Sequence, residues 1–199
     1  LDEADMEREL SGARIVVDAT HPFATLASGN IRAASLAVGS RCLRLARPVE
    51  ALPKGVVSVT SIACAARFLC ENPGRALLTT GSKELAPYAS VDDYAERFFV
   101  RVLPLPGAIT KCLDAGFSPS HIIGMQGPFT RELNEAMLRQ VGAQWLVTKD
   151  SGTVGGTAEK IASARDVGAR CIVVARPAEG GGALSLREVE DALLREFAR

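Results

Sequence analysis

Eight short apolar segments alternate with segments of helical character, and this alternation constrains the fold more than any other feature of the chain. Most of the short segments carry apolar, often β-branched residues at consecutive positions, which is typical of parallel strands covered on both faces. The expected strands are 14–18, 42–46, 56–60, 76–80, 98–102, 121–125, 145–149 and 171–175. This order predicts an α/β protein with doubly wound, mainly parallel sheets.

The expected helices lie between these strands, at roughly 22–38, 61–72, 84–89, 107–115, 130–141, 157–167 and 185–198. Four glycines follow helical segments where a left-handed cap is favoured, namely Gly39, Gly116, Gly142 and Gly168. Ser185 and Glu188 match a capping box that would begin the last helix.

An internal repeat bears on the domain organisation. Residues 37–50 and 166–179 are identical at eight of fourteen positions, and both contain a helix-end glycine, an apolar strand and Ala-Arg-Pro. The repeat has two interpretations. Either αβ units in general use the same residue types at these positions, or the chain contains two similar domains. The second predicts an incomplete Rossmann-like domain at 1–48 with two strands, and a complete one at 49–199 with six, joined by a linker at 49–55. Because the chain opens on Leu1 instead of methionine, we expect the first domain to have been cut.

Charge and aromatic content exclude one class of partner. The chain has 23 basic and 23 acidic side chains, which leaves no global field to attract a nucleic acid. Seven Phe, one Trp and two Tyr are too few for obvious base-stacking platforms. A hydrophobic content of 47% excludes a mainly disordered chain.

The cysteines indicate the compartment. Five scattered cysteines form no C-x-x-C pair, and with two histidines we expect no metal site. They are interpreted as reduced, mostly buried thiols of a cytoplasmic protein. The sequence has no apolar run long enough for a membrane span, and no signal peptide is expected. We expect a cytoplasmic monomer or weak homo-oligomer that binds a small molecule.

The turn after the first strand reads Asp18-Ala19-Thr20-His21-Pro22-Phe23. In open α/β sheets, ligands bind beyond the carboxyl ends of the strands, so Thr20 and His21 would point toward a ligand. Alternatively, Asp18 or Thr20 only caps the following helix.

The turn after strand 76–80 reads Thr80-Gly81-Ser82-Lys83. Gly81 allows close backbone approach, Ser82 can cap the next helix, and Lys83 adds a charge, so the turn can form an anion cradle. It matches neither a G-x-G-x-x-G nor a Walker loop, and an ordinary polar turn explains it equally well.

Three later turns carry further candidates. Gln126 and Gly127 follow strand 121–125, and Arg176 follows strand 171–175. The stretch Thr148–Gly156 is the densest polar and glycine-rich turn, and it suits a phosphate contact or a hydride-transfer site. Glu159 and Lys160, one turn further on, are interpreted as solvated helix residues.

Taken together and in order, these turns resemble the precorrin-6A reductase family of cobalamin biosynthesis. The matching segments are VVDATHPFA at 16–24 with Asn30, LLTTGSKEL at 77–85, FVRVLP at 99–104, IIGMQGPFTRELN at 122–134, LVTKDSG at 146–152, Gly155-Gly156 with Glu159-Lys160, and VVARP at 173–177. Members of that family also begin with a strand and a Gly-Gly-Thr loop, which this sequence lacks.

The resemblance implies a two-domain, nicotinamide-dependent reductase with its cofactor in the cleft between domains. Such an enzyme adds a hydride to a double bond of precorrin-6A or its cobalt form, and a proton to the adjacent carbon. Lys149 or His21 would donate the proton, or water would do so. The substrate, a tetrapyrrole, would contact Asp18, Thr20, Phe23 and Asn30.

The cofactor would contact the second domain through Thr80, Gly81, Ser82, Lys83, Arg101, Gln126, Gly127, Asp150, Ser151, Gly152 and Arg176. NADPH is preferred to NADH because Arg101 or Arg176 would suit a 2′-phosphate. Two alternatives stay open: a non-catalytic nucleotide- or tetrapyrrole-binding module, and another Rossmann-like reductase or transferase.

Overall fold

The protein divides into two compact units. The computed structural model describes residues 3–48, 51–152, 155–177 and 182–198. Unit 1 comprises residues 1–49 and 176–199, and unit 2 comprises residues 50–175. The predicted linker at 49–55 begins outside the described residues, which resume at Ala51.

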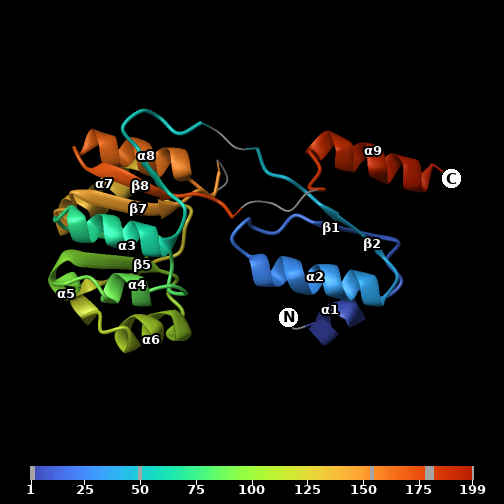
Figure 1. The fold of residues 1–199 in the computed structure, drawn as a ribbon, viewed down its shortest axis with the longest axis horizontal. Helices are drawn as coiled ribbons and strands as arrows, with labels where there is room; N and C mark the ends of the chain where they lie inside the picture. The colour runs from blue at the N-terminus through green and yellow to red at the C-terminus, as the bar shows by residue number, and fades with distance from the viewer. Residues whose placement is uncertain (1–2, 49–50, 153–154, 178–181, 199) are drawn as a thin grey trace. The chain divides into compact units, whose positions relative to one another are not determined.

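Unit 2 is built on six parallel strands (Figure 1). Across the sheet they are β3 (Val57–Val59), β8 (Arg170–Val174), β7 (Trp145–Lys149), β4 (Ala76–Leu78), β5 (Phe98–Val102) and β6 (Ile122–Gly124). All six strands were predicted, and their parallel pairing confirms the α/β class.

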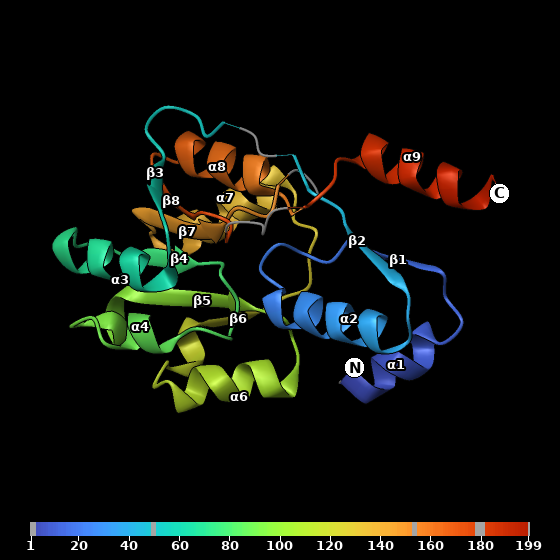
Figure 2. The same ribbon diagram turned by 45° about the vertical axis from the view of Figure 1, so that its right-hand side comes forward.

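Helices cover both faces of this sheet (Figure 2). The helices α3 (Ile62–Glu71), α4 (Ala86–Ala89) and α6 (Pro106–Asp114) lie on one face, and α7 (Arg131–Val141) and α8 (Thr157–Asp166) lie on the other. The change of face follows from right-handed crossovers. The chain moves from β3 through β4 to β6 in one direction, and from β6 through β7 to β8 in the other.

Successive side chains of a strand point to opposite faces of the sheet, so the core of unit 2 has one part on each face. Trp145 of β7 is fully buried and meets Phe68 of α3 edge to face at 5.2 Å. The next residue, Leu146, packs with Met137 of α7 and Ile161 of α8. Consecutive apolar positions in a strand are therefore explained by burial on both sides.

Unit 1 is smaller and contains the parallel pair β1 (Ile15–Asp18) and β2 (Arg41–Arg44). The helices α1 (Glu3–Leu10) and α2 (Thr25–Ala37) pack against each other, and α9 (Leu186–Phe197) lies on the opposite side of the strands from α2 (Figure 1). Val189 and Ala192 of α9 pack against Leu43 of β2.

The assignment of residues to units differs from the predicted second domain at 49–199, because residues 176–199 belong to unit 1. Leu184 bridges Leu45, next to β2, and α9 supplies the apolar cover of that strand. In chain order, β8 is the last strand of the six-stranded sheet. The helix that follows it packs with the smaller unit.

Local signals for helix ends are confirmed. Gly39, Gly116, Gly142 and Gly168 all have positive φ, between +63° and +83°. Ser185 and Glu188 form the capping box at the start of α9. Three short elements were missed: α1, α5 (Tyr94–Arg97) and a 3₁₀ turn at Pro119–His121. None of the three has an apolar stripe long enough to be read from sequence.

Candidate functional site

The carboxyl edge of the six-stranded sheet has one topological switch point, between β4 and β7. These strands are neighbours, yet the chain leaves β4 toward β5 and leaves β7 toward β8, on opposite sides. The connections that follow them therefore lead away to opposite sides, and open α/β sheets bind ligands at such a point.

Side chains from both strand ends meet at this point. Lys149 Nζ donates to Glu84 Oε1 at 3.0 Å, and the lysine is mostly buried while the glutamate is exposed. Thr79 donates to the Val147 carbonyl through both its backbone N–H and its hydroxyl, each at 2.8 Å. The two loops are thus tied together by side chains as well as by the sheet.

The loop after β4 differs from the predicted cradle. The helix α4 starts only at Ala86 and is four residues long, and its N-cap is Leu85 without a side-chain cap. The prediction that Ser82 caps a helix is wrong, because the chain turns for three more residues before the helix starts. Gly81 has φ +82°, and Lys83 is exposed. Thr80 Oγ1 and Tyr88 Oη are both buried and lie close together without a well-formed hydrogen bond.

The loop after β7 is held by its own polar groups. Asp150 Oδ1 accepts from the Gly152 N–H at 3.2 Å, and the Ser151 N–H donates to Thr157 Oγ1 at 3.0 Å. A Cβ on Gly155 would lie 1.9 Å from Ser151 Oγ, so only glycine fits there. Thr153 and Val154, part of the predicted polar turn, lie outside the described residues.

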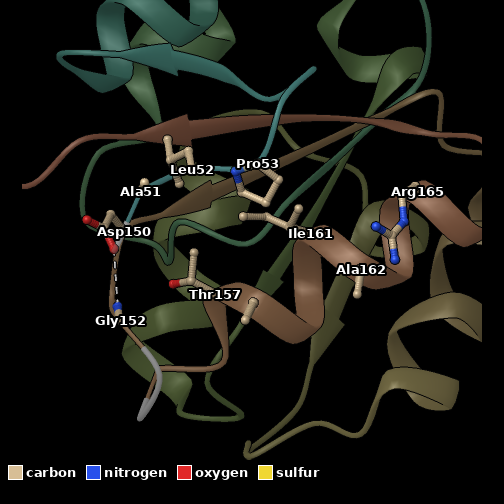
Figure 3. Close-up of a pocket in the computed structure, with 10 residues that line it drawn as sticks. Ala51, Leu52, Pro53, Asp150, Gly152, Thr157, Ile161, Ala162 and Arg165 are labelled. Atoms are coloured by element: carbon tan, nitrogen blue, oxygen red, sulfur yellow. Dashed lines mark hydrogen bonds between the residues drawn. The ribbon is translucent and has the colours of Figure 1, made fainter. Parts of the chain in front are cut away.

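A small apolar pocket of about 150 Å³ borders this loop (Figure 3). Leu52 and Pro53 line it on one side and Ile161 of α8 on the other, with Asp150 at one end and Arg165 at the other. The lining is therefore mainly apolar, with a carboxylate and a guanidinium at its two ends.

A second cavity, of about 600 Å³, lies on the other side of the α8 start. Backbone from three glycines lines it, together with Pro128, Phe129, Asn134, Glu159 and Lys160; the glycines are Gly127, Gly155 and Gly156. Gly127 therefore lies in a cavity wall, whereas its predicted partner Gln126 is exposed.

Arg101 of β5 is buried, at 5% exposure, and contacts two residues that line this cavity. Its guanidinium lies 3.8 Å from the centre of the Phe129 ring and donates to Asn134 Oδ1 at 2.7 Å. Burial lowers the pKa of Arg101 to about 10. Among the described residues, no carboxylate forms an ion pair with it.

Lys160 was not recognised from the sequence as a site residue. It was interpreted as solvated, but its side chain turns back under the loop and donates to the Gly155 carbonyl at 3.0 Å. Burial, reinforced by the charge of Arg101, lowers the pKa of Lys160 to about 8. Glu159 beside it is exposed, as predicted. The Gly-Gly pair before Lys160 was the available signal, because it lets the chain fold over the ammonium group.

In unit 1, the predicted ligand residues Asp18 and Thr20 bond to each other and to Arg44. Asp18 Oδ1 accepts from the Thr20 hydroxyl at 2.7 Å and pairs with Arg44 Nη1 at 2.9 Å. Burial opposes ionisation of this carboxyl, but hydrogen bonds from Thr20 and Ser28 and the charge of Arg44 outweigh it and lower the pKa of Asp18. The network fixes the turn that carries His21.

The other candidates of unit 1 lie around this turn. His21 Nδ1 accepts from the Phe23 N–H at 3.3 Å, and both rings are half-buried. Asn30 lies on α2 and is also half-buried. Arg176 belongs to unit 1, not to the predicted dinucleotide domain, and donates to the Arg47 carbonyl at 3.0 Å.

All five cysteines are free thiols, but only Cys112 and Cys171 are buried and Cys70 is exposed, so the expectation of mostly buried thiols is wrong. Within the described part of the chain, no group of three potential ligands is placed to hold a metal ion. Over the same residues, no helix is long and apolar enough to span a bilayer.

Comparison with known proteins decides the family. The family model described as "Precorrin-6x reductase CbiJ/CobK" matches residues 1–195. The chain belongs to this family. The resemblance seen in the ordered turns is thereby confirmed.

Several relatives in the precorrin-6A reductase family can be aligned over most of the chain. The cobalt-precorrin-6A reductase of Methanothermobacter thermautotrophicus is 39% identical over 183 residues, which are 88% of this chain and 59% of that protein. The Priestia megaterium protein of the same name is 33% identical, over 93% of this chain and 74% of its own. The precorrin-6A reductase of Mycobacterium tuberculosis H37Rv is 29% identical, over 90% and 70%. The chain thus spans less than two thirds of the first of these relatives.

A solved structure described as "CobK precorrin-6A reductase" has the same fold. It superimposes with a TM-score of 0.74 over 98% of this chain and 79% of its own, at 24% identity.

Proposed function

We propose that this chain acts in cobalamin biosynthesis as an NAD(P)H-dependent reductase of the precorrin-6A macrocycle. The cobalt form is the favoured substrate, because the relatives with the higher identities, 39% and 37%, are named cobalt-precorrin-6A reductases. The product would be the corresponding 6B form.

The observation that carries this proposal is the junction at the β4–β7 switch point, where Lys149 of β7 meets Glu84 of the loop after β4. An ammonium group held at the carboxyl edge of a parallel sheet can bind a carboxylate or donate a proton. Gly81 and the glycines of the second cavity leave backbone open to a phosphate-bearing ligand, so the residues present fit a dinucleotide.

The dinucleotide would supply the hydride, and the chain would position the reactants. Thr80, Gly81, Ser82, Lys83, Gln126, Gly127, Asp150, Ser151 and Gly152 are the proposed dinucleotide contacts. On unit 1, the Asp18–Arg44 network holds the turn that presents Thr20, His21 and Phe23 to the substrate, and Asn30 is a further contact. The proton would come from Lys149 Nζ, from the imidazole of His21 or from water.

The decisive experiment is anaerobic incubation with cobalt-precorrin-6A or precorrin-6A and each of NADPH and NADH, followed by the absorption spectrum of the macrocycle. We expect the spectrum to change with one cofactor and the cofactor to be oxidised in equal amount. Binding of cofactor or macrocycle without turnover would instead favour the alternative, a non-catalytic binding module.

Variants then separate the proton donors. Replacing Lys149 with Ala should reduce kcat by about ten-fold or more, because the protonating group is lost. Lys111→Ala is the matched control, since Lys111 is exposed on α6. If Lys149→Ala turns over at the wild-type rate and His21→Ala does not, His21 is the donor; if both retain full activity, water is.

A further inference from the structure

The Thr20 hydroxyl lies at the centre of a network of polar side chains in unit 1. Its oxygen is 2.7 Å from Asp18 Oδ1, 2.8 Å from Ser28 Oγ and 3.0 Å from Arg44 Nη1. An ionised carboxylate only accepts hydrogen bonds and a guanidinium only donates them, so the hydroxyl donates to Asp18 and accepts from Arg44. Its second lone pair faces Ser28. Because a hydroxyl has one hydrogen and two lone pairs, Thr20 Oγ1 has no hydrogen-bonding capacity left for a ligand.

The Asp18 carboxylate is occupied in the same way. Asp18 is 4% exposed, and its Oδ1 also accepts from the Thr20 N–H at 3.0 Å and pairs with Arg44 Nη1 at 2.9 Å. Asp18 and Thr20 were both expected to contact the substrate. Their partners within the chain indicate instead that their polar groups hold the turn, and that the Thr20 side chain can offer a ligand its methyl group alone.

The backbone of this turn is held as well. The Leu45 N–H donates to the Asp18 carbonyl at 3.0 Å, and Arg47 Nη2 donates to the Ala19 carbonyl at 3.0 Å. After the turn, the Ala24 N–H donates to the His21 carbonyl at 2.8 Å. The backbone is therefore held on both sides of the His21 Cα, and the direction of the ring depends on the contacts of the side chain itself.

One nitrogen of the His21 ring accepts a hydrogen bond. The Phe23 N–H donates to His21 Nδ1 at 3.3 Å. A ring nitrogen that accepts carries no hydrogen, so in the neutral ring the hydrogen is on Nε2. A doubly protonated ring would place Nδ1–H against the Phe23 N–H, so that two donors would face each other. The turn therefore favours a neutral His21 that carries its hydrogen on Nε2.

This form of the ring limits the chemistry of His21. A neutral imidazole that released its Nε2 hydrogen as a proton would become an imidazolate, which is far too basic to form at neutral pH. The same N–H can donate a hydrogen bond to an oxygen, and the bond is strongest when the acceptor is a carboxylate. The Phe23 ring lies beside it, with ring centroids 5.7 Å apart. His21 and Phe23 together thus offer one hydrogen-bond donor and adjacent apolar surface.

We propose that His21 binds a carboxylate or carbonyl oxygen of the substrate as a neutral hydrogen-bond donor through Nε2 and is not the source of the proton. Arg44, Ser28 and the Thr20 hydroxyl are positioning residues, which act through the turn that holds His21. The inference rests on the proposed function for the identity of the substrate. It leaves Lys149 and water as the candidates for the proton donor.

The role of His21 is tested by two variants in steady-state kinetics with cobalt-precorrin-6A. His21→Gln keeps an amide N–H but has no proton to transfer, and His21→Phe keeps a ring without a donor. We expect His21→Gln to stay within about three-fold of the wild type in KM and kcat, and His21→Phe to raise KM about ten-fold while kcat changes little. A large and similar fall of kcat in both variants would make His21 the proton source and would overturn the proposal.

The positioning role is tested by removing one hydroxyl at a time. Ser28→Ala leaves the Asp18–Arg44 pair in place, and Thr25→Ala, at an exposed position of the same helix, is the matched control. We expect Ser28→Ala to raise KM about three-fold or more and Thr25→Ala to leave it unchanged. Added to His21→Phe, Ser28→Ala should raise KM no further, because both changes act through His21. Additive effects in the double variant would overturn the positioning role.

Arg44 gives a second test of the same role. Arg44→Lys keeps the positive charge but not the planar guanidinium, and Arg41→Lys, at the exposed start of β2, is its control. We expect Arg44→Lys to raise KM as Ser28→Ala does, with no further rise when it is combined with His21→Phe. If Arg44→Lys does not fold, Ser28→Ala decides the result.

Nitrogen-15 NMR of the histidine side chains needs no substrate. The chain has two histidines, His21 and His121, so the signals lost in His21→Phe assign the spectrum. At about pH 7.5, where an unperturbed imidazole is mostly neutral, we expect His21 in the Nε2–H form alone. Thr20→Val should release the ring into a mixture of both neutral forms, while His121 stays unchanged. A protonated or Nδ1–H ring in the wild type would overturn the proposal.

The outcomes separate this inference from the proposed function. Normal turnover with an unchanged KM in His21→Phe would overturn the inference and leave the reductase proposal standing. A wild-type chain that reduces neither macrocycle would overturn the proposed function. Titration of wild type and His21→Phe with cobalt-precorrin-6A, followed by absorption, then decides the contact: weaker binding by the variant supports it, and equal affinity overturns it.

Discussion

At the scale of single residues, two arginines that lie on strands differ in the partners that hold their charge. Arg44 ends β2 and Arg101 lies within β5, and the sequence analysis named only Arg101 as a candidate. Only the structure shows that Arg44 pairs with Asp18 and that Arg101 has an amide and an aromatic ring instead. The contrast comes from residues distant in sequence, which is why no local pattern reveals it.

The Asp18–Arg44 pair predicts a large loss of stability in unit 1 when one partner is removed. Asp18→Asn leaves the Arg44 charge buried, at 15% side-chain exposure, without its carboxylate. We expect a loss of about 3 kcal/mol in the free energy of unfolding. Urea unfolding followed by near-UV circular dichroism measures it, and Asp92→Asn, at an exposed position, is the control. A change below about 0.5 kcal/mol would mean that the pair is compensated by solvent.

The same carboxyl predicts a pH dependence. Because the pKa of Asp18 is lowered in the folded state, the unfolded chain binds its proton more readily. The stability that Asp18 contributes is therefore present above the usual aspartate pKa of 3.8, and it is lost as the pH falls through the lower pKa of the folded state. Urea titrations between about pH 2.5 and 6 should show this loss in the wild type, and a flatter dependence in Asp18→Asn.

At the scale of elements, the sequence predicts the regular parts of the fold and misses those defined by tertiary contacts. All eight strands and the longer helices after Leu10 follow from apolar periodicity and capping residues, within a few positions. The helix cap expected at Ser82 was wrong because the length of a turn before a helix is set by packing, here of Leu85 and Tyr88, both buried. Lys160 was misread because helical position alone does not show which loop folds over it.

Two glycines should respond differently to replacement by alanine: Gly155, in the loop between β7 and α8, and Gly107, on α6. Gly155→Ala would place a Cβ 1.9 Å from Ser151 Oγ and 2.1 Å from its Cβ, so the loop must shift. We expect a loss of about 2 kcal/mol in stability and weaker NADPH binding. Gly107→Ala on α6 meets nothing within 4 Å and should instead stabilise the protein by about 0.5 kcal/mol. Adding Ser151→Gly to Gly155→Ala should recover part of the loss; no recovery would indicate another cause.

At the scale of the whole molecule, unit 1 is discontinuous in sequence and unit 2 is continuous. The internal repeat places its two copies in different units, one at β2 and one at β8, and both are parallel strands preceded by a helix and a glycine. The first segment of unit 1 ends beside the boundary that the local Ala-Arg-Pro pattern placed near residue 48. The sequence did not predict that residues 176–199 belong to unit 1, because this depends on the packing of α9 against Leu43.

The discontinuity predicts the effect of truncation. A chain that ends after residue 177 lacks Leu184 and the α9 residues Val189 and Ala192, which cover Leu43. We expect hydrogen exchange in β1 and β2 to lose its protection, while the six strands of unit 2 keep theirs. Phe197→Ala, at an exposed position on α9, is the control and should change neither. Persistent protection of β1 and β2 after truncation would show that unit 1 is stable without α9.

The return of the last helix to unit 1 has a consequence for synthesis on the ribosome. The six described strands of unit 2 have all been translated once Val174 is made, so this unit can reach its native contacts before α9 is translated. The two strands of unit 1 precede unit 2 in the chain, whereas the helix that packs against Leu43 follows it. The apolar side of β2 around Leu43 therefore stays uncovered by α9 until the whole of unit 2 has been translated, and chaperones can bind it during that time.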